Sequence, residues 1–333
     1  MDEIRYLIIL PEKPSWQIIA TNLIRCIKEQ VEGASVYCLA NQNCSFILDA
    51  NPNITKVFYV QKTEVLVKEF ENIRIDYIID LQRSRLSYKI RKKLRLVSFE
   101  MKKIIPFQKH FVKFKKDKLK GKHLNDFMFE TVSVFDVKYD GKLPDTYHPS
   151  DSLEALKCLP NSFKDGFIIL SLDSDSPTNT IPESELISLL KEIQYPIAIV
   201  GSEKIAEEAE LLKFTCKRKI YNTAGHYNYD QLIPLIKKSE LVIGYNNEVL
   251  HLAAALNKKI ISIWGSGVPE FGEYPITNNH HDIVEVKGLK CRPCAIGFRK
   301  KCPKKHFRCI KDLPLNNLNY RIFEEINKPD VDL

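Results

Sequence analysis

The chain has 333 residues, enough for two domains of about 150 residues each. Hydrophobic residues make up 44% and charged residues 28%, which excludes a disordered chain and a fibrous repeat. No stretch approaches the roughly 20 apolar residues of a membrane span, and the acidic start Met1–Arg5 is unlike a signal peptide, so we expect a cytoplasmic protein. In that reducing compartment, the nine cysteines are expected to be thiols or metal ligands rather than disulfides.

Hydrophobic periodicity predicts alternating strands and helices in the first half of the chain. The predicted strands are Arg5–Leu10, Ser35–Leu39, Lys56–Val60 and Tyr77–Leu81. The predicted helices are Trp16–Gln30, Ser45–Ala50 and Val65–Glu71. Such alternation is typical of a parallel sheet that is covered by helices on both faces.

The pattern stops at Leu143–Asp151, which contains Pro, Asp and Ser, and then begins again. The later predicted strands are Phe167–Leu172, Ile197–Val200, Leu241–Gly244 and Ile260–Trp264. The later predicted helices are Ser184–Gln194, Lys204–Phe214, Asp230–Lys238 and Val249–Leu256. We therefore predict two parallel-sheet domains joined near residues 144–160, with the ligand site in a cleft between them.

Positive charge is concentrated in one segment. The formal net charge is +8, but the segment Arg83–Lys122 holds 16 Lys or Arg and two acidic residues, so it carries +14 and the rest of the chain −6. Such a block usually meets an anionic partner or surface, although a solvated basic loop is an equal alternative. Four phenylalanines lie among these cations, so a nucleic-acid binder stays open as a hypothesis, which the two-domain pattern disfavours.

Two polar turns in the second half are suited to phosphate. The turn Asn246-Asn247-Glu248 opens the helix that carries His251, and the free backbone N–H groups of a helix N-terminus bind phosphate. The turn Gly265-Ser266-Gly267 follows the next strand and allows a diphosphate to approach the backbone closely. Each turn alone is weak evidence, and a histidine on a helix is more often structural than a ligand.

A cysteine cluster follows near the end of the chain. Its spacing is Cys-x2-Cys-x7-Cys-x6-Cys, formed by Cys291, Cys294, Cys302 and Cys309, with His306 inside it. Four thiolates at such spacing can hold structural zinc. A thiol-rich loop without metal is the alternative, because the x7 spacer is shorter than in common zinc ribbons.

Together these segments resemble glycosyltransferase family 9, the ADP-heptose:lipopolysaccharide heptosyltransferases. The family pattern Asp-Thr-Gly-x-x-His-x-x-Ala-Ala corresponds to Asn246–Ala255, its following Gly-x-Thr turn to the turn at Gly265, and its cysteine tail to Cys291–Ile310. In the first half, Tyr77–Arg83 resembles the family's Asp-Leu-Gln segment. The resemblance covers nearly the whole chain, and the cysteine tail is its most specific part.

The resemblance implies a GT-B fold, an α/β architecture with two Rossmann-like domains that face a cleft. Residues 1–150 would bind the acceptor, residues 151–315 would bind the nucleotide sugar and carry the cysteine tail, and residues 316–333 would form a helix that packs back on the first domain. The implied reaction moves heptose from ADP-heptose, with inversion, to a lipopolysaccharide core or related glycolipid. It requires no cofactor and takes place in the cytoplasm, with peripheral contact to the inner membrane face.

Several family residues are replaced here. The family's proposed general base, an Asp in its first loop, corresponds to Ser15-Trp16, and the nearest carboxylate is Glu12. Its phosphate-binding Lys corresponds to Asn179, and its ribose-binding acid to Glu207 or Glu203. We therefore interpret Glu12 as the candidate base, with Glu248 as another carboxylate. The competing interpretation is that Glu12 is a surface residue in a loop stiffened by Pro11 and Pro14. If no base survives, the chain is a catalytically silent relative that binds a nucleotide sugar or an anionic glycan.

The expected donor-binding residues are Ser174, Asn179, Glu203, Glu207, Asn246, Asn247, Glu248, His251, Gly265, Ser266 and Gly267. The expected acceptor-binding residues are the basic residues Arg83, Arg85, Lys113, Lys115 and Lys116.

Overall fold

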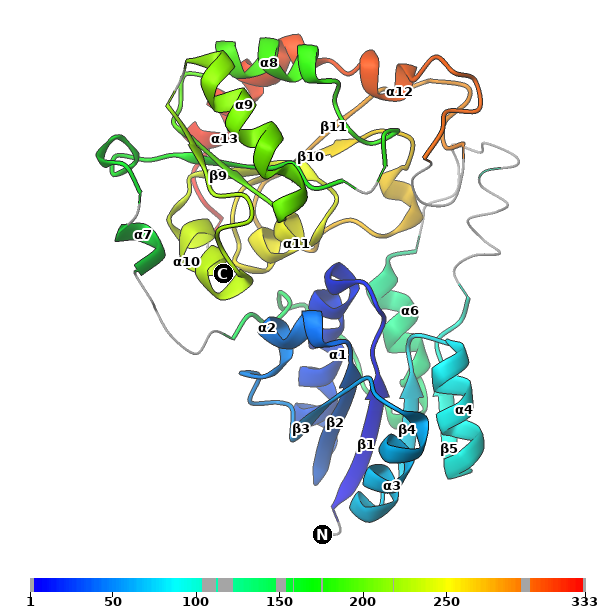
Figure 1. The fold of residues 1–333 in the computed structure, drawn as a ribbon. Coiled ribbons are helices and arrows are strands. Elements are labelled where there is room, and N and C mark those ends of the chain that lie inside the picture. The colour runs from blue at the N-terminus through cyan, green and yellow to red at the C-terminus, as the bar shows by residue number, and fades with distance from the viewer. Residues whose placement is uncertain are drawn as a thin grey trace. The chain divides into compact units, whose positions relative to one another are not determined.

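The structure, a computed structural model, describes residues 3–103, 112, 122–147, 154–157, 159–174, 176–217, 219–294 and 300–331. The chain divides into two compact units, the first formed by Met1–Ile104 with Lys122–Pro149 and the second by Ile105–Gly121 with Ser150–Leu333. Each unit contains one parallel sheet (Figure 1), which confirms the predicted α/β class. Within the described ranges, no helix is long and apolar enough to cross a membrane.

The first unit is built on a five-stranded sheet with the order β3-β2-β1-β4-β5. Its strands are β1 (Ile4–Ile9), β2 (Ala34–Ala40), β3 (Lys56–Tyr59), β4 (Tyr77–Asp80) and β5 (Val97–Glu100). Its helices are α1 (Pro14–Gln30), α2 (Ser45–Leu48), α3 (Thr63–Ile73), α4 (Arg85–Leu94) and α6 (Leu124–Thr131). Leu7 and Ile9 of β1 pack with apolar residues of α3 and α4, while α1 packs against α6.

The second unit is built on a six-stranded sheet with the order β11-β10-β9-β6-β7-β8. Its strands are β6 (Ile168–Ser171), β7 (Ile197–Val200), β8 (Ile220–Asn222), β9 (Leu241–Tyr245), β10 (Ile260–Trp264) and β11 (His281–Glu285). Its helices are α7 (Glu154–Lys157), α8 (Glu183–Glu192), α9 (Ala206–Cys216), α10 (Tyr229–Lys238), α11 (Glu248–Ala255), α12 (Arg308–Lys311) and α13 (Leu318–Asn327).

The basic block begins with regular structure and not with a solvated loop. Leu86, Ile90 and Leu94 lie four residues apart, so they form one apolar side of α4 that packs against the core of the first sheet. Ser84 caps the helix by accepting a hydrogen bond from the Ser87 N–H at 3.0 Å. This apolar side consists of three residues, and the Lys and Arg residues between them obscure the helical periodicity of the sequence.

The last helix, α13, belongs to the core of the second unit. Leu318 and Ile322 are fully buried there, and Arg321 pairs with Asp282 of β11 at 2.6 Å. Its predicted return to the first domain stays a prediction.

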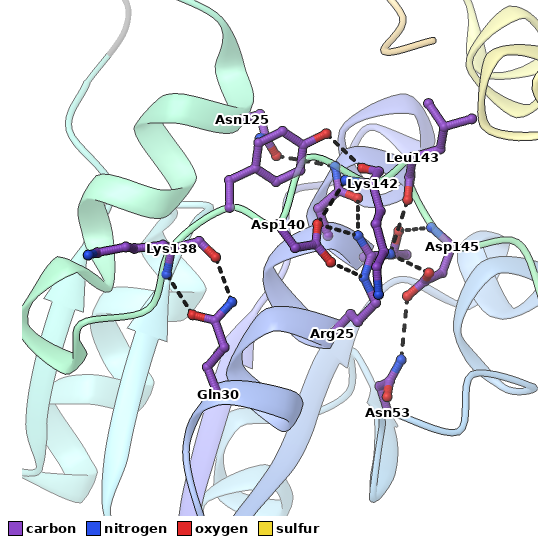
Figure 2. A network of polar contacts seen from close by, with 12 residues as sticks. Arg25, Gln30, Asn53, Asn125, Lys138, Asp140, Lys142, Leu143 and Asp145 are labelled. Carbon is purple, nitrogen blue, oxygen red and sulfur yellow. Dashed lines mark hydrogen bonds and ion pairs between the residues drawn. The ribbon is translucent and has the colours of Figure 1, made fainter. Parts of the chain in front are cut away.

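A buried arginine in α1 holds the chain that follows α6 (Figure 2). Arg25 is 4% exposed and pairs with both carboxylate oxygens of Asp140, with Asp145 and with the carbonyl of Leu143. Burial raises the pKa of Asp140, but the hydrogen bonds from Arg25 outweigh it and hold that pKa below its usual value. The network therefore fixes residues 140–145 on α1 as they leave the first unit.

A second buried group gives the second unit a pH dependence. His281 begins β11, and its Nε2 lies 2.7 Å from the hydroxyl of the fully buried Ser262, which also accepts a hydrogen bond from Trp264 Nε1. Burial lowers the pKa of His281 to about 4, from an ordinary value of 6.5. The neutral ring is therefore the form that the folded protein accommodates.

We expect the second unit to be less stable at pH 5 than at pH 7 by about 2 kcal/mol because of this ring. A histidine with a lowered folded pKa contributes stability above its unfolded pKa, and that contribution is lost as the pH falls from about 6.5 toward 4. Urea unfolding of a Trp16→Phe variant, followed by the fluorescence of Trp264, measures this difference. His281→Gln should remove most of it, and an unchanged pH dependence in that variant would contradict the assignment.

Candidate functional site

The first candidate site is a pocket of about 290 Å³ in the first unit, at the carboxyl ends of β1 and β4. These strands are neighbours in the sheet. The chain order reverses between them, because β2 and β3 lie on one side of β1, whereas β4 and β5 lie on its other side. Such a reversal is where ligands bind in open parallel sheets. The lining residues are Pro11, Glu12, Lys13, Trp16, Leu81, Gln82 and Ser84.

Glu12 and Gln82 meet in this pocket. Gln82 donates a hydrogen bond from Nε2 to Oε1 of Glu12 at 2.8 Å, although the residues are 70 positions apart. Lys13 places its Nζ 5.0 Å from the centre of the Trp16 ring, a distance at which a cation is attracted to an aromatic face. The exposed carboxylate of Glu12 is thus oriented by an amide and still open to a substrate.

The loop that presents Gln82 is shaped by Asp80, the fully buried last residue of β4. Its Oδ1 accepts hydrogen bonds from the N–H groups of Gln82 at 3.1 Å and Arg83 at 2.7 Å, and Arg91 of α4 lies 3.0 Å from its Oδ2. Arg83 takes a positive φ of 56°, a backbone conformation that residues other than glycine seldom adopt. Asp80 therefore fixes both the direction of the loop and the position of Gln82.

The predicted acceptor-binding residues fall into two groups. Arg83 is held by Glu100 at 3.1 Å and by the carbonyl of Met101, whereas Arg85 is exposed at the start of α4. The other three, Lys113, Lys115 and Lys116, lie outside the described residues.

The second candidate site lies in the second unit, at the carboxyl ends of β6, β7, β9 and β10. Here too the chain order reverses, between β6 and β9. Asn247 joins these two strand ends, because its Nδ2 donates to Ser171 Oγ at 2.9 Å and to the Asp173 carbonyl at 3.2 Å. Its Oδ1 accepts from the Leu250 N–H and caps α11.

The residues beside Asn247 are also engaged with the protein. Asn246 contacts His251 Nε2 at 3.1 Å and donates to the Glu273 carbonyl. Glu248 accepts a hydrogen bond from the Tyr229 hydroxyl at 2.7 Å. His251 is 2% exposed, and its contact with the donor stays a prediction.

The turn at Gly265 is packed against the loop that carries Asn179. Asn179 is buried and its Oδ1 accepts the N–H of Gly265 at 2.9 Å, while the Ser266 N–H donates to the Thr178 carbonyl at 3.0 Å. The Ser266 and Thr178 hydroxyls are 2.8 Å apart. The N–H groups of Gly265 and Ser266, which the sequence suggested for a diphosphate, therefore donate hydrogen bonds within the protein. Asn179 binds the turn through its side-chain oxygen.

We expect Gly265→Ala to destabilise the second unit by about 1–3 kcal/mol, the usual cost of overpacking. The added Cβ would lie 2.2 Å from the Thr178 carbonyl oxygen and 2.9 Å from the Asn179 Cα, and backbone atoms do not move aside as a flexible side chain does. Urea unfolding followed by Trp264 fluorescence in the Trp16→Phe background measures the change. An unfolding midpoint equal to that of the parent would show that the loop yields freely.

The remaining predicted donor-binding residues lie around the same sheet edge. Ser174 follows β6, and its hydroxyl is 3.3 Å from the Ser176 carbonyl. Glu203 lies in a short 3-10 helix (Glu203–Ile205) after β7, Glu207 lies in the first turn of α9, and both are exposed. Gly267 offers its carbonyl to the guanidinium of Arg292.

The cysteine cluster lines a mostly apolar cavity of about 270 Å³ next to this turn. All four cysteines reach it, together with His306, Thr178 and Ser266. The pKa of Cys302 lies below its ordinary value. Partial burial raises this pKa, but hydrogen bonds from the backbone N–H groups of residues 304–307 lower it by more. Burial raises the pKa of Cys309 to about 11.

The four thiols are not placed as a zinc site in this structure, which corresponds to the metal-free alternative that the sequence left open. Across the part of the chain that the structure describes, no three His, Cys, Asp or Glu side chains are placed to hold one metal ion. Cys291 lies 3.6 Å from His306 Nε2, and Cys309 turns toward the Thr178 carbonyl at 3.9 Å, so they point to different partners. The described cysteines are free thiols.

Gln82, Asp173 and Arg292 belong to the candidate sites but are not among the residues predicted from the sequence. Gln82 follows a predicted strand directly, and that position alone was a usable signal. Asp173 accepts the N–H and hydroxyl of Ser202, which joins the ends of β6 and β7. Arg292 pairs with Glu285 at 2.5 Å and donates a hydrogen bond to the Gly265 carbonyl, which holds the turn. No sequence motif predicts this role.

A model of the family described as glycosyltransferase family 9 (heptosyltransferase) matches residues 66–307. Among solved structures, the chain is similar to the Escherichia coli ADP-heptose LPS heptosyltransferase II, with a TM-score of 0.74 and 15% identity over 97% of this chain and 98% of that one.

A family 9 glycosyltransferase from Veillonella parvula DSM 2008 gives a TM-score of 0.73 at 13% identity over 98% of each chain. The E. coli heptosyltransferase WaaC with ADP gives 0.65 at 14% identity, over 97% of this chain and all of that one. A search of curated proteins by sequence found no match. The structural likenesses confirm the predicted GT-B fold class.

Proposed function

The chain belongs to glycosyltransferase family 9, and on that premise we propose that it transfers heptose from ADP-heptose, with inversion, to a lipopolysaccharide core or related glycolipid. Family membership supports glycosyltransferase activity, and the similar structures are named as heptosyltransferases, one of them with ADP. The observation that carries the proposal is the Glu12–Gln82 pair in the pocket between β1 and β4.

In this reaction an acceptor hydroxyl attacks the anomeric carbon of heptose on the face opposite ADP. The new bond forms between the acceptor oxygen and that carbon, the bond from that carbon to the phosphate oxygen breaks, and ADP leaves with the electron pair. A carboxylate must take the hydroxyl proton, from about 3 Å or through one water. We assign that role to Glu12, with Gln82 holding its other oxygen free to face the acceptor.

We propose residues 1–150 as the acceptor domain, with Arg83, Arg85 and the basic residues beyond them attracting an anionic acceptor. We propose residues 151–315 as the donor domain, with the diphosphate near the N-terminus of α11, where the helix dipole favours an anion. Catalysis would use no metal, since base and leaving group are handled by side chains and N–H groups. The protein would act in the cytoplasm, at the inner face of the membrane.

Incubation of the purified chain with ADP-heptose and a deacylated core acceptor tests the proposal. We expect ADP release and a heptosylated acceptor that can be seen by mass spectrometry, and no product when UDP-glucose replaces ADP-heptose. Failure to bind ADP-heptose would contradict the donor assignment.

A second candidate function is a catalytically silent relative that binds a nucleotide sugar or an anionic glycan. It is favoured by Asn179, which stands where the family has a phosphate-binding Lys and is bonded to Gly265 instead of facing a ligand. Glu248 also adds a carboxylate at the helix N-terminus proposed for the diphosphate. Binding of ADP-heptose without turnover would select this function.

A further inference from the structure

Helix α4 presents an exposed face that carries cations and no acids. Between Arg83 and Phe99 the sequence has seven Lys or Arg and no Asp or Glu. Leu86, Ile90 and Leu94 pack inward, so Arg85, Tyr88 and Lys92 lie on the opposite face of the helix. The exposed cations of α4 and its C-cap are Arg85, Lys89, Lys92, Lys93 and Arg95.

Most of this charge is not neutralised within the protein. Arg91 is used by Asp80 and Glu100, and Lys93 pairs with Glu64 of α3 at 2.7 Å. Arg85, Lys89, Lys92 and Arg95 form no ion pair with any residue that the structure describes. At 1.5 Å per residue, they extend over about 15 Å of helix.

Apolar groups lie among these cations. Tyr88 is 56% exposed on the same side of α4 as Arg85 and Lys92, and Val97 is 58% exposed on the neighbouring edge strand β5. Ser84, the cap of this helix, lines the pocket at the ends of β1 and β4, and none of the exposed cations of α4 is among the residues that line it. A tyrosine ring surrounded by cations suits the headgroup level of a lipid surface, where its ring and hydroxyl meet apolar and wet surroundings together.

We propose that the exposed face of α4 is a docking surface for a membrane that contains anionic phospholipid. Each Lys or Arg near such a surface strengthens binding about fivefold, and several spaced along one helix face contact several headgroups at once. Tyr88 adds contact at the interface. The proposal rests on the proposed function in one respect, the membrane location of the glycolipid acceptor, and its test needs neither donor nor acceptor.

The test is sedimentation of the full chain with vesicles of phosphatidylcholine and phosphatidylglycerol, compared with phosphatidylcholine alone. We expect binding to the anionic vesicles only, weakened by salt. A triple variant, Arg85→Gln, Lys89→Gln and Lys92→Gln, should bind them about 100-fold more weakly. The matched control neutralises Lys164, Lys219 and Lys238, three exposed lysines of the second unit, and should bind as the parent does.

Three outcomes would overturn the proposal: equal binding to both kinds of vesicle, equal losses in the triple variant and its control, or displacement of the protein from anionic vesicles by single-stranded oligonucleotide at equal phosphate concentration. The last outcome would assign the face to nucleic acid. Because the vesicles contain no glycolipid, a negative result leaves heptosyl transfer to be decided by its own assay.

Discussion

Glu12→Gln is expected to lower the turnover number by about two to four orders of magnitude, with the affinity for ADP-heptose unchanged. Glutamine keeps the shape of the side chain and can still accept the hydrogen bond from Gln82, so the pocket keeps its geometry. It cannot take a proton from the acceptor hydroxyl. Steady-state kinetics gives the turnover number, and calorimetric titration with ADP-heptose gives the donor affinity.

The chain offers a matched control in the same unit. Gln61 donates to Glu69 at 3.0 Å, the same kind of amide–carboxylate pair on an exposed surface away from the pocket. Glu69→Gln should leave turnover at the parental value. Full activity in Glu12→Gln would eliminate Glu12 as the base and transfer the assignment to another carboxylate, with Glu248 the first to examine.

Arg25→Ala is expected to destabilise the first unit by about 3–5 kcal/mol. The substitution leaves Asp140 and Asp145 without the cation that compensates their burial, and it removes the donor to the Leu143 carbonyl. Unfolding of the two units need not coincide, so the probe must belong to the first unit. Urea unfolding of a Trp264→Phe background, followed by the fluorescence of Trp16, isolates it.

Lys93→Ala is the control variant for Arg25→Ala, because the ion pair between Lys93 and Glu64 is exposed. Exposed ion pairs contribute at most about 1 kcal/mol to the free energy of unfolding. Similar losses in the two variants would show that the Arg25 network is no stronger than a surface ion pair. A loss several times larger for Arg25→Ala is the result we expect.

The sequence predicted the elements whose apolar pattern is set by burial. Ile197–Val200 and Ile260–Trp264 are strands with the predicted bounds, because every residue in them is buried and Ser262 is their single polar residue. Helix α4 was missed because its apolar side has only three residues among many cations. Strand β11 was missed because only Val284 of its five residues is buried.

The candidate sites were less predictable, because they depend on which strands are neighbours. The position of Glu12 after β1 could be read from the chain, but its partner Gln82 follows from the placement of β4 beside β1. For Asn179, the sequence suggested a role that the packing of its loop does not support. Alignment with a phosphate-binding residue suggested contact with ligand, whereas the packing of its loop on Gly265 directs the amide to the backbone.

At both candidate sites, the hydrogen bonds described above join residues of a single unit, and this has a consequence for protein engineering. The hydrogen bonds named for Glu12, Gln82 and Asp80 join residues of the first unit, and those named for Asn247 and Asn179 join residues of the second. A chimera that joins residues 1–149 of this chain to the second half of a relative would therefore cut none of them. A library of such hybrids would test the proposal that the first unit sets the choice of acceptor and the second the choice of donor.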